Sequence, residues 1–224
     1  MIKNVMRDLV LTVVAVLLPT MTQGQNLPDY EDANLSFRGV LVEAGRIFPN
    51  KIEDTDIFAL RFDLGFLTPG FRIVPGVAFW TSTMAQDEVN KFESLLGQLN
   101  TDQGGSSPSG GFDLGSIKRD DVVLSLDGSY MWSIPLDFFF WAGVGASVHF
   151  LNGSGPAVNG TFVEDLMDSV SPGFNVHGGL EYPIKDRFRI YGGSKIEILG
   201  DLRYLELRFG MNYIWGNLVQ GEAR

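Results

Sequence analysis

The chain of 224 residues contains no cysteine. Disulfide scaffolds, cysteine-based zinc sites and thiol chemistry are therefore excluded. Basic residues are also scarce, since 17 Lys and Arg stand against 27 Asp and Glu and give a formal net charge of −10. Because so few cations are available to neutralise phosphates, we expect no nucleic-acid partner. Beyond the N-terminal segment, no apolar run is long enough to cross a membrane as a helix.

The N-terminal segment has the order of a secretory signal peptide. Lys3 and Arg7 precede the apolar stretch Leu9–Leu18, and small or polar residues follow it. As a helix this stretch spans about 15 Å, half of a bilayer core of about 30 Å, which disfavours a transmembrane anchor. We therefore assign residues 1–24 to a cleaved signal peptide and residues 25–33 to a periplasmic N-terminal stub.

From residue 34 onward, large apolar residues alternate with small or polar ones at a period of two, which is typical of strands. Short turns join consecutive strands into three hairpins: 58–66 with 71–80, 121–133 with 137–151, and 173–184 with 187–199. Segments 34–48 and 202–215 bring the number of predicted strands to eight. Eight strands form the smallest common closed barrel.

The two faces of these strands have opposite chemistry. One face carries charges together with Gly and Ser, and the other is almost entirely Leu, Val, Ile, Phe and Tyr. Small and charged residues suit a crowded interior and large apolar residues suit lipid, so we expect a polar interior and an apolar exterior. The predicted interior charge network comprises Arg61, Asp63, Arg72, Asp127, Glu181, Arg189, Lys195, Glu197, Glu206 and Arg208.

Aromatic residues on the apolar face gather at both strand ends, as in the two belts of a membrane barrel. The spacing of eight residues from Phe58 to Phe66 corresponds to about 27 Å along a strand and about 20 Å of depth after tilt. This arrangement disfavours a soluble sandwich. The predicted belts contain Phe66, Phe71, Trp132, Phe138, Tyr182, Phe188, Tyr213 and Trp215 near the tight turns, and Phe58, Phe79, Phe150 and Phe174 at the far ends.

The last strand carries the most specific motif. In Arg208–Trp215, a polar residue is followed by Gly210 two positions later and by the aromatic residues Tyr213 and Trp215. The motif resembles the assembly signal of eight-stranded bacterial outer-membrane barrels of the OmpA, OmpX, OmpW and opacity-protein kind. The resemblance extends over residues 34–215. Nine residues, 216–224, follow the final aromatic residue, and we assign them to a periplasmic tail.

The resemblance implies an all-β fold, an eight-stranded antiparallel up-and-down transmembrane barrel in the bacterial outer membrane. It also implies outer-membrane lipid and lipopolysaccharide as surroundings, and recognition of the last strand by the barrel-assembly machinery. A surface ligand or host protein is a further possible partner.

Two strands depart from the simple alternation. Pro75 has no amide hydrogen to donate, so we expect a bulge or a shifted register beside it. In the first strand, Leu35, Phe37 and Leu41 share a face with Glu43; either a bulge near Val42 restores the pattern, or the lipid-facing part of the strand ends there.

The long connections, residues 85–120 and 152–172, lie opposite the tight turns and are expected outside the cell. Apolar residues at helical spacing predict short amphipathic helices over 85–99 and 161–170. Such helices would cap the barrel mouth, rest on the lipid surface or form a partner's docking face.

His149 and His177 face the predicted interior, with Ser147 close to His149. A Ser-His dyad and a metal pair are the chemical alternatives, but no acid stands at a fixed spacing. We therefore expect hydrogen-bonded interior histidines and no catalytic residue, metal or cofactor. The predicted function is that of a non-enzymatic envelope or surface-interaction protein acting through its extracellular loops. A narrow channel and a lipid-modifying enzyme are the alternatives.

Overall fold

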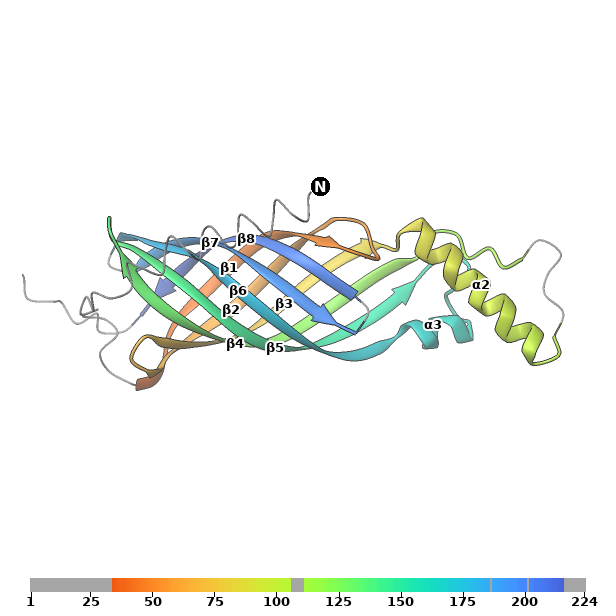
Figure 1. The fold of residues 1–224 in the computed structure, drawn as a ribbon, viewed down its shortest axis with the longest axis horizontal. Coiled ribbons are helices and arrows are strands. Elements are labelled where there is room, and N and C mark those ends of the chain that lie inside the picture. The colour runs from red at the N-terminus through yellow and green to blue at the C-terminus, as the bar shows by residue number, and fades with distance from the viewer. Residues whose placement is uncertain (1–33, 106–110, 186, 201, 216–224) are drawn as a thin grey trace, which may run out of the picture.

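The computed structural model describes residues 34–105, 111–185, 187–200 and 202–215, and the predicted signal peptide, stub and tail lie outside these ranges. Eight strands pair in chain order and close into one antiparallel barrel (Figure 1), which confirms the predicted fold. The strands are β1 (Asn34–Pro49), β2 (Thr55–Thr68), β3 (Phe71–Thr83), β4 (Lys118–Ile134), β5 (Phe138–Ser154), β6 (Ser169–Lys185), β7 (Phe188–Leu199) and β8 (Leu202–Ile214).

The barrel closes where β1 pairs with β8, in an unbroken register from Gly39 opposite Ile214 to Pro49 opposite Tyr204. Closure leaves no strand edge to expose unpaired backbone groups. On the far side, β4 and β5 pair from Ile134 opposite Phe138 up to Lys118 opposite Ser154. These strands extend beyond the predicted boundaries at 121 and 151 because polar residues continue the ladder toward the helices.

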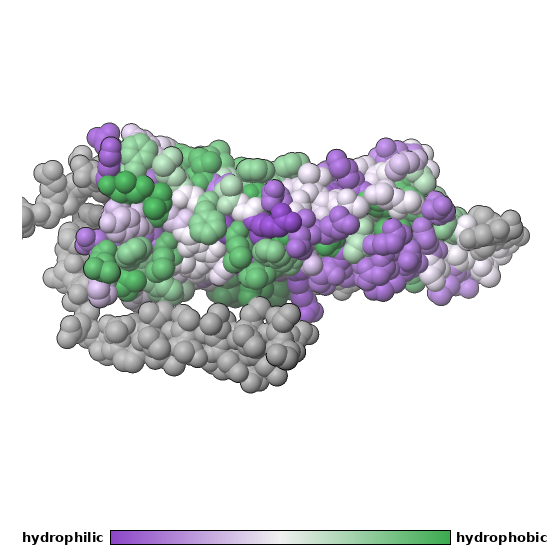
Figure 2. Space-filling model, turned by 90° about the horizontal axis from the view of Figure 1, so that it is seen from above, coloured by the Kyte–Doolittle hydropathy of each residue, from purple (hydrophilic) through white to green (hydrophobic). Residues whose placement is uncertain are grey.

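The wall has the predicted sidedness. Apolar side chains on the outward face are exposed, for example Phe58 at 63 % and Val176 at 52 %. Figure 2 shows hydrophobic residues along the barrel wall and hydrophilic ones gathered toward the end that carries the helices. Such an exterior is stable against lipid rather than water.

Two apolar layers cross the interior at different depths. The helix-side layer lies near the barrel mouth, and the turn-side layer lies nearer the tight turns. The helix-side layer comprises Ile47, Ile52, Ile57, Trp80, Val123, Leu151, Leu199 and Tyr204. The turn-side layer comprises Leu41, Phe66, Val74, Met131, Trp141 and Tyr191.

The placement of Phe66 in the outward belt was wrong, since its side chain is 2 % exposed and belongs to the turn-side layer. The β2–β3 register gains one residue on β2 between Arg61 and Phe66, and Gly65 there has a φ of +76°. This bulge reverses the alternation, so that Leu67 is exposed instead. The irregularity expected beside Pro75 is present, but the extra residue lies in the neighbouring strand β2. Pro75 itself stays in register with Leu126 of β4.

The predicted bulge near Val42 was also wrong. The β1–β2 register shifts between Leu35 and Gly39, so Val42 is outward at 58 % exposure while Leu41 and Glu43 point inward. A Cβ on Gly39 would lie 2.6 Å from the Tyr213 carbonyl oxygen, so only glycine fits at this crossing. The same register shift separates Leu41 from Leu35 and Phe37: Leu41 is buried in the interior, whereas the other two are exposed.

Two helices stand above the barrel mouth, and together with their flanking loops they form what we call the cap (Figure 1). Helix α2 covers Gln86–Asp102, slightly longer than predicted. Helix α3 covers only Phe162–Met167 instead of 161–170, because Thr161 caps its first turn and Ser169 already begins β6. The cap has its own apolar core, formed by Val89, Leu96, Leu114, Ile117, Val158, Val163 and Met167.

Within the described ranges, no helix is both long and apolar enough to span a membrane.

Substituting Gly145 by alanine tests how tightly the interior is filled. An added Cβ would overlap Asp127 Oδ1 and approach Asn175 Nδ2 to 2.6 Å. We expect Gly145→Ala to lower the free energy of unfolding by about 1–3 kcal/mol. Gly97→Ala is the control, because nothing lies within 4 Å of the added methyl group in α2, and the better helix propensity should raise stability by up to about 1 kcal/mol. Urea unfolding of the refolded barrel in lipid vesicles measures both, and equal effects would contradict the packing argument.

Candidate functional site

The structure places all ten predicted interior charges inside the barrel, each at 6 % exposure or less. Two further carboxylates that were not in the predicted set join them: Glu43 at 3 % and Asp121 at 0 %. Glu43 was missed because the parity of β1 was misassigned. Asp121 continues the inward alternation of Val123 and Ser125, which was a usable signal.

The interior charges form two groups, and the larger one begins near the mouth. Asp121 Oδ2 accepts from His149 Nδ1 at 2.6 Å, and Glu197 Oε1 lies 3.5 Å from His149 Nε2. Lys195 then joins Glu197 at 3.1 Å and Glu206 at 3.2 Å. The Lys195–Glu197 pair lies within β7 and the other steps cross between strands, so the chain of ion pairs links β4, β5, β7 and β8.

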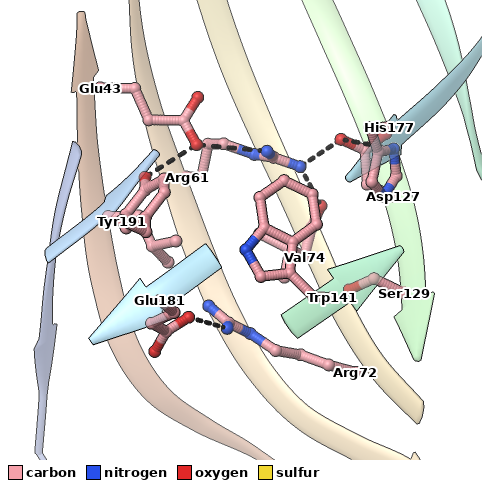
Figure 3. A pocket seen from close by; sticks show the side chains of 11 residues that line it. Glu43, Arg61, Arg72, Val74, Asp127, Ser129, Trp141, His177, Glu181 and Tyr191 are labelled. Carbon is pink, nitrogen blue, oxygen red and sulfur yellow. Dashed lines mark hydrogen bonds and ion pairs between the residues drawn. The ribbon is translucent and has the colours of Figure 1, made fainter. Parts of the chain in front are cut away.

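The same group continues across the barrel seam. Arg208 of β8 lies 3.4 Å from Glu43 of β1, and Glu43 also accepts from Arg61 at 3.2 Å and from the Tyr191 hydroxyl at 2.8 Å. Arg61 donates in turn to Asp127 of β4 (Figure 3). Glu43 is therefore the residue that connects the two halves of the group.

The far end of this group contains the second histidine. Asn175 Nδ2 donates to Asp127 at 3.0 Å, and its Oδ1 lies 2.7 Å from His177 Nδ1. The His177 ring packs against Trp141 with 5.5 Å between ring centroids. Both predicted histidines are thus hydrogen-bonded members of one network, at opposite ends of it.

The smaller group lies toward the tight turns. Arg72 pairs with Asp63 at 3.2 Å and with Glu181 at 2.8 Å, and Arg189 reaches Glu181 at 3.2 Å. Trp141 lies between this group and the Arg61 pairs (Figure 3). Two cations and two carboxylates balance within the group.

Glycines make room for these side chains. Cβ atoms on Gly143 and Gly145 of β5 would meet His177 and Asp127, and one on Gly173 of β6 would overlap Ser147. The glycine-rich inner face of β5 and β6 therefore provides the space that the charged side chains occupy.

Ser147, His149 and Asp121 have the spacing of a catalytic triad, since Ser147 Oγ lies 3.0 Å from His149 Nε2 and Asp121 lies 2.6 Å from Nδ1. The Ser147 hydroxyl, however, donates to Glu197 at 2.5 Å. A methyl group on Gly173 would already overlap the hydroxyl oxygen, so the backbone of β6 packs closely against it on that side. The arrangement serves to satisfy buried polar groups.

The space left inside the barrel is very small. One cavity, between Glu43, Arg61 and Arg72, has a volume of about 20 Å³, and a second, beside Lys195 and Glu206, has a volume of about 10 Å³, so each holds about one water molecule at most. Among the described residues, no group of three or more His, Asp or Glu side chains has a geometry that could hold a metal ion. The interior is therefore filled by its own side chains.

The residues of the predicted assembly signal lie in two places: Gly210 in the interior, and Tyr213 and Trp215 at the tight-turn end. Gly210 lies beneath the Tyr191 ring, where a Cβ would come within 2.5 Å of the hydroxyl oxygen. Tyr213 packs on Phe188 and Trp215 with centroid distances of 5.0 and 5.8 Å, at the tight-turn end of the barrel. Their recognition during assembly stays a prediction.

A much larger cavity, of about 520 Å³, lies at the mouth between the cap and the barrel rim. Its apolar lining comes from α2, α3 and the top of the helix-side layer, and Lys51, Lys91 and Arg119 contribute cationic groups. We call it the mouth cavity. Lys91 is already engaged, because it donates to Glu88, and this hydrogen bond raises the pKa of the Lys91 ammonium.

No family model and no curated protein matches the chain. Among solved structures, Neisserial surface protein A superposes with a TM-score of 0.50 at 13 % identity, covering 80 % of this chain and 97 % of that one. Ail of Yersinia pestis gives a TM-score of 0.47 at 11 % identity over 81 % and 99 % of the two chains. The N-terminal barrel of Pseudomonas aeruginosa OprF gives 0.42 at 13 % identity over 78 % and 97 %. The resemblance to eight-stranded outer-membrane barrels is thus confirmed as a likeness of fold.

Replacing Arg61 by methionine tests the ion-pair network. The change removes the guanidinium partner of the buried Asp127 carboxylate and one of the two guanidinium partners of Glu43, and we expect the free energy of unfolding to fall by about 3–5 kcal/mol. Arg46→Met is the matched control, because the Arg46–Asp56 pair is exposed at 52 % and 66 % and such pairs contribute about 1 kcal/mol or less. Urea unfolding in vesicles compares the two. A loss no larger for Arg61→Met than for Arg46→Met would contradict a coupled interior network.

Proposed function

We propose that the protein is a non-enzymatic barrel of the bacterial outer membrane that acts at the cell surface through its cap. Outer-membrane lipid and lipopolysaccharide would surround the wall, and the barrel-assembly machinery would recognise the last strand. The observation that carries the proposal is the contrast between the two ends of the molecule. The interior cavities described above each hold about one water molecule at most, whereas the cap has its own apolar core and a large cavity.

The filled interior supports this proposal over the channel alternative. An eight-stranded barrel is only just wide enough for its own side chains, and here two apolar layers and two groups of ion pairs occupy that width. A conducting path would have to break several buried ion pairs at once, and breaking such pairs is costly.

The lack of space around Ser147 supports a non-enzymatic role. Ser147 is 5 % exposed and His149 and Asp121 are 0 % exposed, with Gly173 packed against the hydroxyl. A lipid substrate would need the barrel wall to open before it reached the hydroxyl. The accessible part of the molecule is the cap, and loops carried on a rigid scaffold often provide the binding residues of a protein.

Because the chain has no cysteine, single-cysteine variants test the orientation directly. We expect Gln98→Cys in α2 to react with a membrane-impermeant maleimide on intact cells. Thr68→Cys, exposed at the tight turn between β2 and β3, should react only after the outer membrane is permeabilised. The parent protein serves as the unlabelled control. The reverse labelling pattern would overturn a surface-exposed cap.

Planar-bilayer recording tests the closed interior. We expect no discrete conductance steps from residues 25–224 refolded in detergent, because the described interior has no continuous space; a gel-mobility shift between boiled and unboiled samples verifies the fold. A porin recorded in parallel shows that the assay detects conduction. Discrete steps that change in Glu206→Ala would instead establish a channel.

A further inference from the structure

The mouth cavity presents an apolar surface on two sides and below. Helix α2 contributes Phe92 and Leu95, and α3 contributes Leu166 and Met167. Leu95 and Leu166 are 59 % and 60 % exposed, so their side chains face the open space. The floor is formed by Leu151 and Leu199 of the helix-side layer, and the volume of about 520 Å³ is typical of small-molecule sites.

Among the described residues, one cation that lines this cavity has no ion-pair partner. Arg119 is half-buried at the inner wall of β4, and among the described residues it makes no ion pair or side-chain hydrogen bond. Asp121 and Asp168 are the acids whose charges act on Arg119, but both are hydrogen-bonded elsewhere: Asp121 to His149, and Asp168 to Asn152 and to the Gly153 amide. A partly desolvated guanidinium beside an apolar surface favours an anionic ligand.

The rim of the cavity is low on one side. Strands β7 and β8 have 12 and 13 residues, against 17 in each of β4, β5 and β6. Ile198, the partner of the outward aromatic Phe174, lies only two positions before Gly200 at the β7–β8 turn. Figure 1 shows this hairpin ending well short of the helices. The barrel wall beside the cavity is therefore short at the β7–β8 hairpin, close to the level of the outer aromatic belt, where a lipid interface lies.

We propose that the mouth cavity binds a single-chain anionic amphiphile, such as a long-chain carboxylate. The acyl chain lies between Leu95 and Leu166 over the floor residue Leu199, and the carboxylate binds Arg119. The cation and the apolar walls together match a ligand with one charged end, and the low rim admits it from the outer leaflet. This inference rests on the proposed surface orientation of the cap and adds to it a ligand class.

Fluorescence quenching by 12-bromododecanoate tests the site in nanodiscs of zwitterionic lipid. Trp80 lies in the helix-side layer beneath the cavity floor, so a bound brominated chain should quench it. The background variant Trp132→Phe/Trp215→Phe removes the two tryptophans on the outward face, which brominated chains in the bilayer would quench. We expect saturable quenching in this background.

Three variants separate the parts of the site, each verified as folded by its gel-mobility shift. Arg119→Gln should weaken binding of the acid about tenfold, the value of one charged hydrogen bond, and leave 12-bromododecanol unaffected. Leu95→Gln should weaken both ligands, because it alters the wall that holds the chain. Arg46→Gln, an exposed cation that does not line the cavity, should change neither.

Quenching that does not saturate, or that is equal for the acid in wild type and Arg119→Gln, would overturn the proposed site. Tighter binding of the alcohol than of the acid would overturn the anionic class. These failures are distinguishable from failure of the proposed function. A barrel that shows the expected maleimide labelling and electrical silence but no saturable quenching would lose only the ligand site.

Discussion

The inverted sidedness of the wall is the constraint on which the rest of this structure depends. With the outward face given to apolar side chains, the charged residues in the middle of the alternating strands point into a narrow barrel, while outward charges such as Arg46 and Asp56 lie near the strand ends. Charges that leave water must be paired and hydrogen-bonded. The ion-pair groups, the glycines that make room for them and the apolar layers between them are all consequences of that requirement.

The cap is stabilised by an apolar core of its own. Its core, built around Val89, Leu96 and Val163, is separate from the two layers inside the barrel. The barrel thus provides a filled support, while the mouth cavity, which Arg119 lines, lies where the two parts meet. The junction therefore has room for a ligand, which the filled interior does not.

Much of the fold was predictable because alternation and turn residues act locally. Eight strands, their sidedness and the ten interior charges follow from a period of two. What failed were positions where register changes without a local signal: the bulge at Gly65 turned Phe66 inward, and the shift before Gly39 hid the role of Glu43. The order of the ion pairs was not predictable either, since Glu43 and Arg208 are 165 positions apart and meet only through barrel closure.

That last contact ties assembly to electrostatics. Glu43 sits on β1 and binds both Arg208 across the seam and Arg61 on the neighbouring strand. In a sheet of the same eight strands that had not yet closed, Glu43 would keep its pair with Arg61, but Arg208 on β8 would lie apart from Glu43. Closing the seam and completing the Glu43–Arg208 pair are therefore one event, which disfavours a half-closed barrel.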